Sequence, residues 1–455
     1  MVLGDIMPEK MKGTPYFKIK DEFQKFITYI QSSTLMKLGI LFNLIWITFT
    51  LFAFFYVLAF DNLSNTVFTE DFEVFYTAGM LIRTNIDELY MSSLYNLPYR
   101  YLPTFAYFYI LVSYIPFNFA YLANVAFMFA INFLSTFMIY ELCMRFYLMP
   151  KDPKLTRKLI FLFFMAPVQV VNYILGQISP LFIFFLLFSL ILIENSEKKV
   201  YNIPHCDLYG GILLGLAITL KPFAILVVPF LLVFKGSTKE NINSLIRNLD
   251  FKRTLNRFFG IIIILIPNLF IFLRDQKLLQ EFIDINFHET LQNHHSTSLT
   301  RLIIDVLNSF RSEVNQVLIF IVIICITFFI SFTRFLMNPD RANRMAYYFQ
   351  EAMLLMMLSY MDSWFLYSVI WLSVLIPVLM DFEYTYEEAG GRKIKMVTAL
   401  RRIGRLLNIY FAIPVILYYF VLGFDPLSPV FLLLFYVLYQ YMIFKKLSIR
   451  KKEVL

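Results

Sequence analysis

Three carboxylates follow the first long apolar run of the chain. They are Glu70, Asp71 and Glu73, within the sequence Thr-Glu-Asp-Phe-Glu-Val-Phe-Tyr. A carboxylate that is held against a membrane and an aromatic wall can act as a general base. Asp71 or Thr69 can instead only cap the helix, a role that Asp and Thr often take, and the spacing alone favours this alternative.

Two further groups of polar residues interrupt otherwise apolar sequence. Arg100 lies between Tyr99 and Tyr101, a pattern typical of an aromatic belt with a snorkelling arginine. Residues 293–301 bring two of the four histidines together with hydroxyl side chains and Arg301. A histidine pair can serve a metal or a phosphate, but without carboxylates at ligand spacing it is weak evidence for a metal.

A lone lysine, Lys221, lies in the middle of a predicted membrane span and is followed by Pro222. A buried ammonium in hydrocarbon costs about 2.5 kcal/mol or more, so we expect an anionic or carbonyl partner. The alternative is a lysine that snorkels from a broken helix, because the proline frees backbone carbonyls nearby. The sequence has no phosphate-cradling glycine loop and no HExxH or GxSxG motif, which makes ATP hydrolysis and zinc proteolysis poor interpretations.

The composition places these residues in a membrane protein. Of 455 residues, 59% are hydrophobic and 16% are charged, and the mean hydropathy of +0.66 exceeds that of soluble domains. A hydrocarbon core of about 30 Å takes about 20 apolar residues as a helix. We therefore predict an all-α polytopic membrane protein with about twelve transmembrane helices. The three cysteines are too few and too scattered for a disulfide framework or a zinc site.

Apolar runs bounded by charge define the predicted spans. The first, residues 38–60, follows a basic tail and is predicted to be a retained signal anchor with a cytoplasmic N-terminus. Two spans are expected within 101–141 and two within 159–193. The others are expected near 208–234, 258–273, 314–333, 345–361, 363–380, 406–424 and 426–444.

The domain organisation follows from these spans. We expect a cytoplasmic tail over residues 1–37, a single transmembrane domain over 38–445 and a cytoplasmic tail over 446–455. Two long segments within the transmembrane domain, 61–100 and 274–313, are expected outside the cytoplasm.

The positions of lysine and arginine support this topology in all but one place. The basic segments 235–257 and 381–406 fall inside, as the positive-inside rule requires. The basic stretch 145–158 disagrees, since the count places it outside. Either the rule fails there or one of the four segments before residue 200 is re-entrant.

Amphipathic patterns indicate helices that lie on the membrane surface. Both outer segments carry apolar stripes at helical spacing, over residues 72–80 and 299–310. On the inside, residues 394–407 alternate apolar with basic side chains, which suits anionic membrane lipids as partners.

Six sequence elements, taken in order, resemble glycosyltransferase family 87 of the GT-C superfamily. They are Asp71 to Ala78, Leu89-Tyr90, the Tyr-x-Tyr-x-Pro of Tyr99 to Pro103, Gly176-Gln177, Gly215-Leu216-Ala217 leading to Lys221-Pro222, and Ser298-Leu299 with Arg301. That family includes polyprenyl-phosphate-mannose-dependent α-mannosyltransferases. The resemblance covers about residues 38–380, and the ordered set carries it rather than any single motif.

The resemblance implies a GT-C-like hexosyltransferase in the plasma membrane. Such an enzyme moves a sugar, with mannose expected, from a polyprenyl-phosphate donor to a glycan or glycolipid acceptor outside the cytoplasm, with inversion at the anomeric carbon. It implies Asp71 as the general base, and Arg100, Arg301 and His295 as groups that stabilise the leaving phosphate. The substrate-binding residues that it implies are Glu73, Tyr76, Tyr99, Arg100, Gln177, Lys221, His294, His295, Ser298 and Arg301.

No cofactor, no metal and no nucleic-acid partner is expected. The segment Asp71-Phe72-Glu73 can still hold a divalent ion weakly. The chain departs from the family pattern at Leu102, where a second proline is usual, and at residues 359–365, where the family has a Ser-Pro-x-x-Trp-x-His-like element. These departures affect the expected acceptor site more than the donor site.

Two other functions fit a polytopic membrane protein. A secondary transporter or a flippase of lipid-linked saccharides tends to show inverted repeats and paired charges at the midplane, whereas Lys221 stands alone in the sequence. A membrane scaffold without chemistry leaves the two long outer segments unexplained.

Overall fold

The computed structural model describes residues 15–60, 69–147, 153–166, 168–235, 248–288, 296–310, 315–338, 344–361, 363–388 and 427–453. Within these ranges the chain forms helices and no strands, as predicted. The α-helices are α1 (Pro15–Gln31), α2 (Thr34–Phe60), α3 (Glu70–Thr84), α4 (Pro103–Ala106), α5 (Phe117–Glu141), α6 (Pro153–Met165), α7 (Val168–Leu175), α8 (Ser179–Lys198), α9 (Cys206–Leu220), α11 (Phe251–Arg274), α12 (Gln276–Ile283), α13 (Leu299–Ser309), α14 (Gln316–Met337), α15 (Met345–Ser359), α16 (Ser368–Glu388) and α18 (Leu427–Glu453).

Short 3-10 and π-helical turns connect several of these helices. They are η2 (Ile86–Glu88), η3 (Ser92–Leu94), η4 (Tyr107–Tyr109), η5 (Val112–Tyr114), η6 (Leu142–Phe146), η7 (Pro222–Leu231), η8 (Asp284–His288) and η10 (Phe365–Tyr367). The longest of them, η7, follows α9 directly and begins with a proline.

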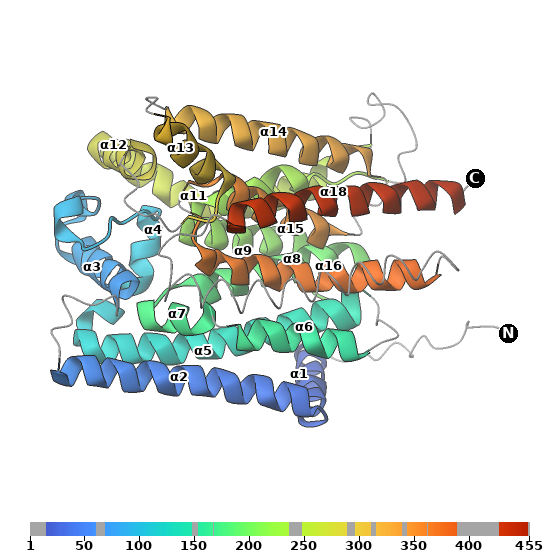
Figure 1. Ribbon diagram of the computed structural model, residues 1–455, viewed down its shortest axis with the longest axis horizontal. Coiled ribbons are helices and arrows are strands. Elements are labelled where there is room, and N and C mark those ends of the chain that lie inside the picture. The colour runs from blue at the N-terminus through green and yellow to red at the C-terminus, as the bar shows by residue number, and fades with distance from the viewer. Residues whose placement is uncertain are drawn as a thin grey trace.

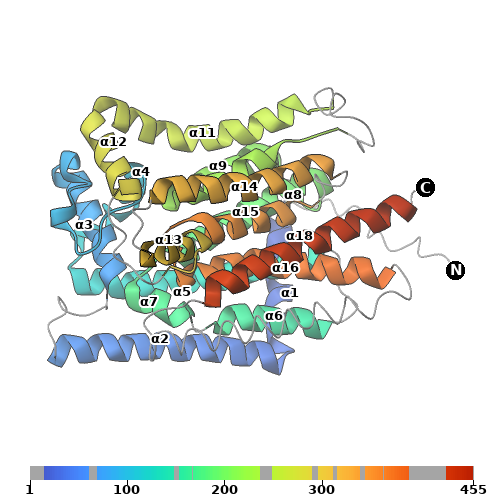
Figure 2. The ribbon, with the colours of Figure 1, turned by 45° about the horizontal axis from the view of Figure 1, so that its top comes forward.

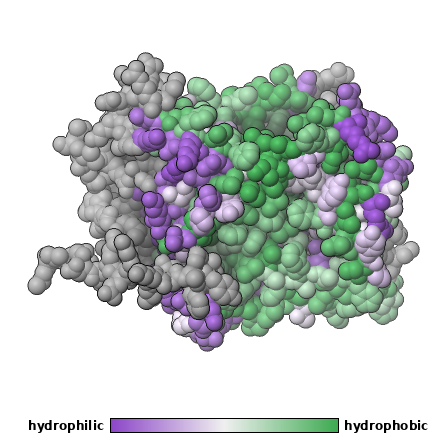
Figure 3. All heavy atoms as spheres, turned by 180° about the vertical axis from the view of Figure 1, so that it is seen from behind, coloured by the Kyte–Doolittle hydropathy of each residue, from purple (hydrophilic) through white to green (hydrophobic). Residues whose placement is uncertain are grey.

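The long helices lie side by side along the longest axis of the molecule (Figures 1 and 2). The short helices α3, α4, α12 and α13 gather at one end of this bundle, which we call the α3 end, while α1 stands steeply against α2 near the opposite end. Seen from behind, a broad hydrophobic band covers the middle of the surface and hydrophilic residues flank it on both sides (Figure 3). This distribution is what a membrane-embedded bundle requires.

Among the described residues, six helical segments are long and apolar enough to cross a membrane: Thr34–Phe60, Phe117–Phe146, Thr156–Leu175, Ser179–Lys198, Phe251–Arg274 and Gln316–Met337. Four shorter apolar helices accompany them. The predicted number of twelve spans is therefore not confirmed. The expected span 406–424 and the basic amphipathic segment 394–407 lie outside the described residues.

Residues 101–115 do not form the predicted span. They make α4, η4 and η5 instead, because Pro103 starts a new helical turn and the side chain of Asn268 on α11 accepts hydrogen bonds from the backbone N–H and hydroxyl of Thr104, both at 2.8 Å. With this span removed, the stretch after α5 lies at the opposite end of the bundle, where Arg145 pairs with Glu22 of α1. A count with one span fewer before residue 145 no longer conflicts with the positive-inside rule at residues 145–158.

Helices α9 and α11 approach each other so closely that only glycine fits between them. A Cβ added to Gly211 would lie 2.1 Å from the carbonyl oxygen of Arg257, and one added to Gly260 would lie 2.3 Å from that of Leu208. Small residues that let two backbones meet are a common device for packing helices in membranes.

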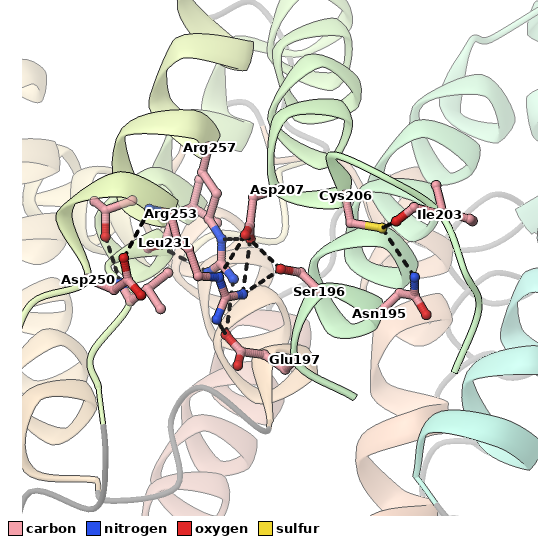
Figure 4. A network of polar contacts seen from close by, with 12 residues as sticks. Asn195, Ser196, Glu197, Ile203, Cys206, Asp207, Leu231, Asp250, Arg253 and Arg257 are labelled. Atoms are coloured by element: carbon pink, nitrogen blue, oxygen red, sulfur yellow. Dashed lines mark hydrogen bonds and ion pairs between the residues drawn. The ribbon is translucent and has the colours of Figure 1, made fainter. Parts of the chain in front are cut away.

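A network of charged residues joins the same two helices to α8 (Figure 4). The carboxylate of Asp207 accepts hydrogen bonds from Nε of Arg257 at 2.7 Å and from Nε of Arg253 at 2.8 Å. Arg253 also pairs with Glu197 of α8 at 2.7 Å. Because the side chain of Arg257 is only 1% exposed, loss of a carboxylate partner would leave a buried charge unpaired.

We expect Gly211→Ala to lower the free energy of unfolding by about 1–3 kcal/mol, because the new methyl group meets a backbone oxygen that cannot move away alone. Gly39→Ala on α2 is the matched control, since its nearest neighbour is a ring atom of Phe161 at 3.2 Å. The control should change stability by no more than about 1 kcal/mol. Thermal unfolding of the two purified variants in one detergent compares them, and equal midpoints would refute this account of the packing.

Candidate active site

A cavity of about 330 Å³ lies at the α3 end of the bundle. Its polar lining consists of Asp71, Arg100, Gln177, Lys221, Asn286 and Ser359. Aromatic side chains cover a second wall, among them Tyr101, Phe223, Tyr360, Trp364 and Tyr367. The third wall is apolar and includes Ile225, Leu226, Phe320 and Ile324. Segments from seven separate parts of the chain thus meet around one space.

The start of α3 brings Asp71 to this cavity. Thr69 occupies the N-cap position in the left-handed conformation, with φ of 66°, and makes no capping hydrogen bond with its side chain. Asp71 is the second residue inside the helix, so the structure does not bear out the interpretation of Asp71 as a cap. The backbone N–H of Thr69 donates to the carbonyl of Ile174 at 3.0 Å, which ties the start of α3 to the end of α7.

The turn after α7 holds one oxygen of the Asp71 carboxylate. Gln177 donates from Nε2 to Oδ2 of Asp71 at 2.9 Å. The other side-chain atom of this glutamine, Oε1, accepts from the backbone N–H of Ile178 at 2.9 Å, so the amide group faces the carboxylate with its donor side. Gly176 makes the turn possible, because it has φ of +69° and a Cβ there would lie 2.5 Å from Cβ of Phe72.

Lys221 reaches the cavity from the point where α9 ends and η7 begins. Its residue is only 2% exposed, and Nζ lies 4.3 Å from the ring centroid of Tyr367 and 5.5 Å from that of Tyr101. Within the described part of the chain, Nζ makes no hydrogen bond or ion pair. The expected anionic partner is Asp71, which lines the same cavity and interacts electrostatically with Lys221 without a direct ion pair. The close contacts of Nζ are with aromatic faces.

Burial is the main influence on the pKa of Asp71, and it raises this pKa above the usual range of an aspartate. The charge of Lys221 and the hydrogen bond from Gln177 act in the opposite direction, while Glu70 adds to the increase. Burial also raises the pKa of Glu70, with a further contribution from Glu73. A carboxylate with a raised pKa in a cavity is a candidate for proton transfer near neutral pH.

Four of the residues implied by the family resemblance line the cavity together: Asp71, Arg100, Gln177 and Lys221. Three others of the first outer segment lie outside its lining. Tyr99 is fully buried and donates to the carbonyl of Leu102 at 3.1 Å. Glu73 accepts from Asn96 at 2.7 Å, and Tyr76 donates to the carbonyl of Ile115 at 2.9 Å.

The implied residues of the second outer segment do not line the cavity in the described structure. Ser298 caps α13 and accepts from the backbone N–H of Arg301 at 3.1 Å, and the guanidinium of Arg301 pairs with Asp305 at 2.9 Å. His294 and His295 lie outside the described residues. In the part of the chain that the structure covers, no three His, Cys, Asp or Glu side chains are grouped to hold a metal ion.

Most of the aromatic wall was not identified from the sequence. The backbone N–H of Thr297 donates to the carbonyl of Ser363 at 2.7 Å, and the hydroxyl of Thr300 donates to the backbone carbonyl of Ser359 at 2.6 Å. These bonds fix residues 359–361 and 363–367 against the second outer segment and bring Tyr360, Trp364 and Tyr367 to the cavity. The only signal for them was the late element that departs from the family pattern.

The contact between Gln177 and Asp71 predicts a measurable shift. Hydrophobic carbodiimides react with protonated carboxyl groups, so their reaction with Asp71 should persist to a higher pH than for an ordinary aspartate. Gln177→Leu removes a donor that lowers the pKa of Asp71, and we expect the reaction to extend to still higher pH. Asn96→Leu, which removes the donor to Glu73, should leave the profile unchanged. Peptide mass spectrometry measures the labelling of Asp71 as a function of pH. Identical labelling profiles for Gln177→Leu and wild type would exclude the role of Gln177 in lowering the pKa of Asp71.

A family match covers most of the segments that line the cavity. The model of glycosyltransferase family 87 matches residues 99–360, which is more than half of the 455 residues. The match includes Arg100, Gln177 and Lys221 of the cavity. It begins after Asp71, which therefore lies outside the matched residues. Searches of curated proteins and of solved structures find no match. The chain belongs to glycosyltransferase family 87, and it is a glycosyltransferase with several membrane-spanning helices.

Proposed function

We propose that this protein transfers a sugar, with mannose as the first candidate, from a polyprenyl-phosphate carrier to a glycan or glycolipid acceptor outside the cytoplasm. The observation that carries the proposal is the lining of one cavity, where a carboxylate with a raised pKa and two cationic side chains face apolar and aromatic walls. Membership of a glycosyltransferase family removes the reason to retain a transporter or flippase as the alternative.

In this proposal Asp71 is the general base. Gln177 occupies its Oδ2, and Oδ1 takes the proton from the acceptor hydroxyl. The acceptor oxygen forms a bond to the anomeric carbon while the bond between that carbon and the phosphate oxygen breaks, and the electron pair leaves with polyprenyl phosphate. Attack from the face opposite the phosphate inverts the anomeric configuration. Phosphate is a good leaving group, so no separate general acid is needed.

Arg100 and Lys221 supply positive charge for the donor phosphate. A sugar phosphodiester carries one negative charge, and a second develops on the phosphate as the glycosidic bond breaks. Two cations that are already in place in a site of low dielectric stabilise this developing charge without reorganisation. With Asp71 ionised, the three charged side chains of the lining sum to +1, which matches a monophosphate donor.

The apolar wall supports a lipid carrier instead of a water-soluble sugar nucleotide. Phe320 and Ile324 come from α14. This helix is a candidate membrane span, and only 17% of its most apolar stretch is buried inside the protein. Ile225 lines the cavity and is itself 53% exposed. A prenyl chain in the bilayer can therefore lie against residues that also border the phosphate-binding groups.

The distribution of basic residues supports an active site outside the cytoplasm. Arg145 and the charged network of Arg253 and Arg257 lie at the end of the bundle opposite the cavity. The positive-inside rule then assigns that end to the cytoplasm. We propose the plasma membrane as the location, as the family resemblance implies.

We expect Asp71→Asn to lower turnover by about 10² to 10⁴-fold, which is typical for loss of a general base. The amide keeps the shape of the side chain and an oxygen that can accept from Gln177, so binding of the lipid-linked sugar donor should remain. The assay uses purified protein in lipid nanodiscs with polyprenyl-phosphate-mannose and candidate glycan acceptors. Glu70→Gln is the matched control, because Glu70 is the adjacent carboxylate outside the lining. Near-normal turnover by Asp71→Asn would exclude the carboxylate mechanism.

The two arginines implied by the resemblance should now differ. Arg100→Ala removes a cation of the lining, so we expect a loss of about tenfold or more in kcat/KM for the lipid-phosphate donor. Arg301→Ala should cost less than about threefold, since Arg301 pairs with Asp305 outside the lining. Steady-state kinetics with both variants measure this difference. A larger loss for Arg301→Ala would move the phosphate site to α13.

A further inference from the structure

Lys221 is held in the cavity by aromatic rings. Its Nζ lies 4.3 Å from the ring centroid of Tyr367 and 5.5 Å from that of Tyr101, within the distance of about 6 Å at which ring faces attract a cation. The residue is 2% exposed and borders the cavity. Asp71 and Lys221, both described, form no ion pair with each other.

The kind of partner matters for what this ammonium can bind. A carboxylate at contact distance would accept N–H bonds from Nζ and cancel its charge. A ring face attracts the cation through its quadrupole and takes no strong hydrogen bond. Lys221 therefore keeps its N–H donors for a ligand, although it is removed from water.

Both rings are fixed by their own neighbours. The ring of Tyr101 packs edge-on against Phe75 at 5.1 Å and lies 4.9 Å from the ring of Phe105. The ring of Tyr367 lies 5.5 Å from that of Phe223, and its backbone N–H donates to the carbonyl of Trp364 at 2.9 Å. Two segments that are far apart in the sequence thus position one side chain.

We propose that Tyr101 and Tyr367 form an aromatic clamp that holds Lys221 as the receptor for the phosphate of the lipid carrier, in the donor and in the polyprenyl phosphate product. The two tyrosines are positioning residues, because they act through the lysine. The inference rests on the proposed lipid-phosphate donor. It predicts that removal of the ring of Tyr367 weakens recognition of the phosphate and leaves recognition of the prenyl chain intact.

The test measures the binding of polyprenyl phosphate and of the corresponding uncharged polyprenol to the full-length protein in nanodiscs. Tyr367→Leu should weaken binding of polyprenyl phosphate by about tenfold, within the range of a desolvated cation–ring contact, and should change polyprenol binding little. Tyr367→Phe retains the ring and should stay within about threefold of wild type. Tyr360→Leu makes the same change at a cavity ring that packs against Phe223 and should weaken both lipids equally.

A double-mutant cycle separates the contact between Tyr367 and Lys221 from any general disruption of the cavity by the substitution. In the Lys221→Gln background the ring has no cation to hold, so adding Tyr367→Leu should not weaken phosphate binding further. Equal effects of Tyr367→Leu on both lipids, or a full additional loss in the Lys221→Gln background, would overturn the clamp. If Tyr367→Leu does not fold, Tyr101→Leu takes its place in the same cycle.

The outcomes separate the clamp from the proposed function. If wild-type protein prefers polyprenyl phosphate and Tyr367→Leu retains that preference, the clamp is wrong and the donor class stands. If wild-type protein does not distinguish polyprenyl phosphate from polyprenol, the lipid-phosphate donor itself is wrong, and the clamp fails with it.

Discussion

The site depends on keeping opposite charges buried around one cavity without letting them neutralise each other. In the described structure Asp71 is bound by the neutral amide of Gln177, and Lys221 is bound by the faces of two tyrosine rings. Neutral partners of this kind stabilise each group in place, yet leave it able to act on a ligand. A direct ion pair between them would be more stable in isolation and would remove both the base and the phosphate receptor.

The rest of the fold supplies the rigidity that this arrangement needs. Lys221 ends α9, and α9 is locked to α11 through glycine contacts and through the buried charges around Asp207. Asp71 lies in the first turn of α3, and α3 is tied to the end of α7 at Thr69 and packs against the following turn at Gly176. The charged network (Figure 4) lies at the start of α9 and Lys221 follows the end of that helix, so the network positions Lys221 through α9.

Periodicity and composition were sufficient to predict the helical class, a span at residues 38–60 and helical stripes over 72–80 and 299–310. The structure has these helices at Thr34–Phe60, Glu70–Thr84 and Leu299–Ser309. They failed at 101–115, because an apolar run long enough to cross a membrane was broken by Pro103 and by hydrogen bonds that Thr104 donates to distant Asn268. Family resemblance pointed to Asp71, Arg100, Gln177 and Lys221, which the fold brings together. Neither source distinguished Tyr99 in the core from Tyr101 in the cavity, and neither found Tyr367. In a chain with 19% aromatic residues, only tertiary contacts show which aromatic side chains line the cavity and which pack in the core.

The central claim is that a lipid-linked sugar phosphate binds between the cations and the carboxylate of this cavity. A cryo-EM structure of the protein in nanodiscs with a non-transferable polyprenyl-phosphonate mannoside tests it most directly. The account predicts the phosphonate within hydrogen-bonding distance of Lys221 and Arg100, the prenyl chain along the α14 wall, and space for an acceptor hydroxyl between Oδ1 of Asp71 and the anomeric carbon. A phosphonate bound elsewhere, or an anomeric carbon turned away from Asp71, would contradict it.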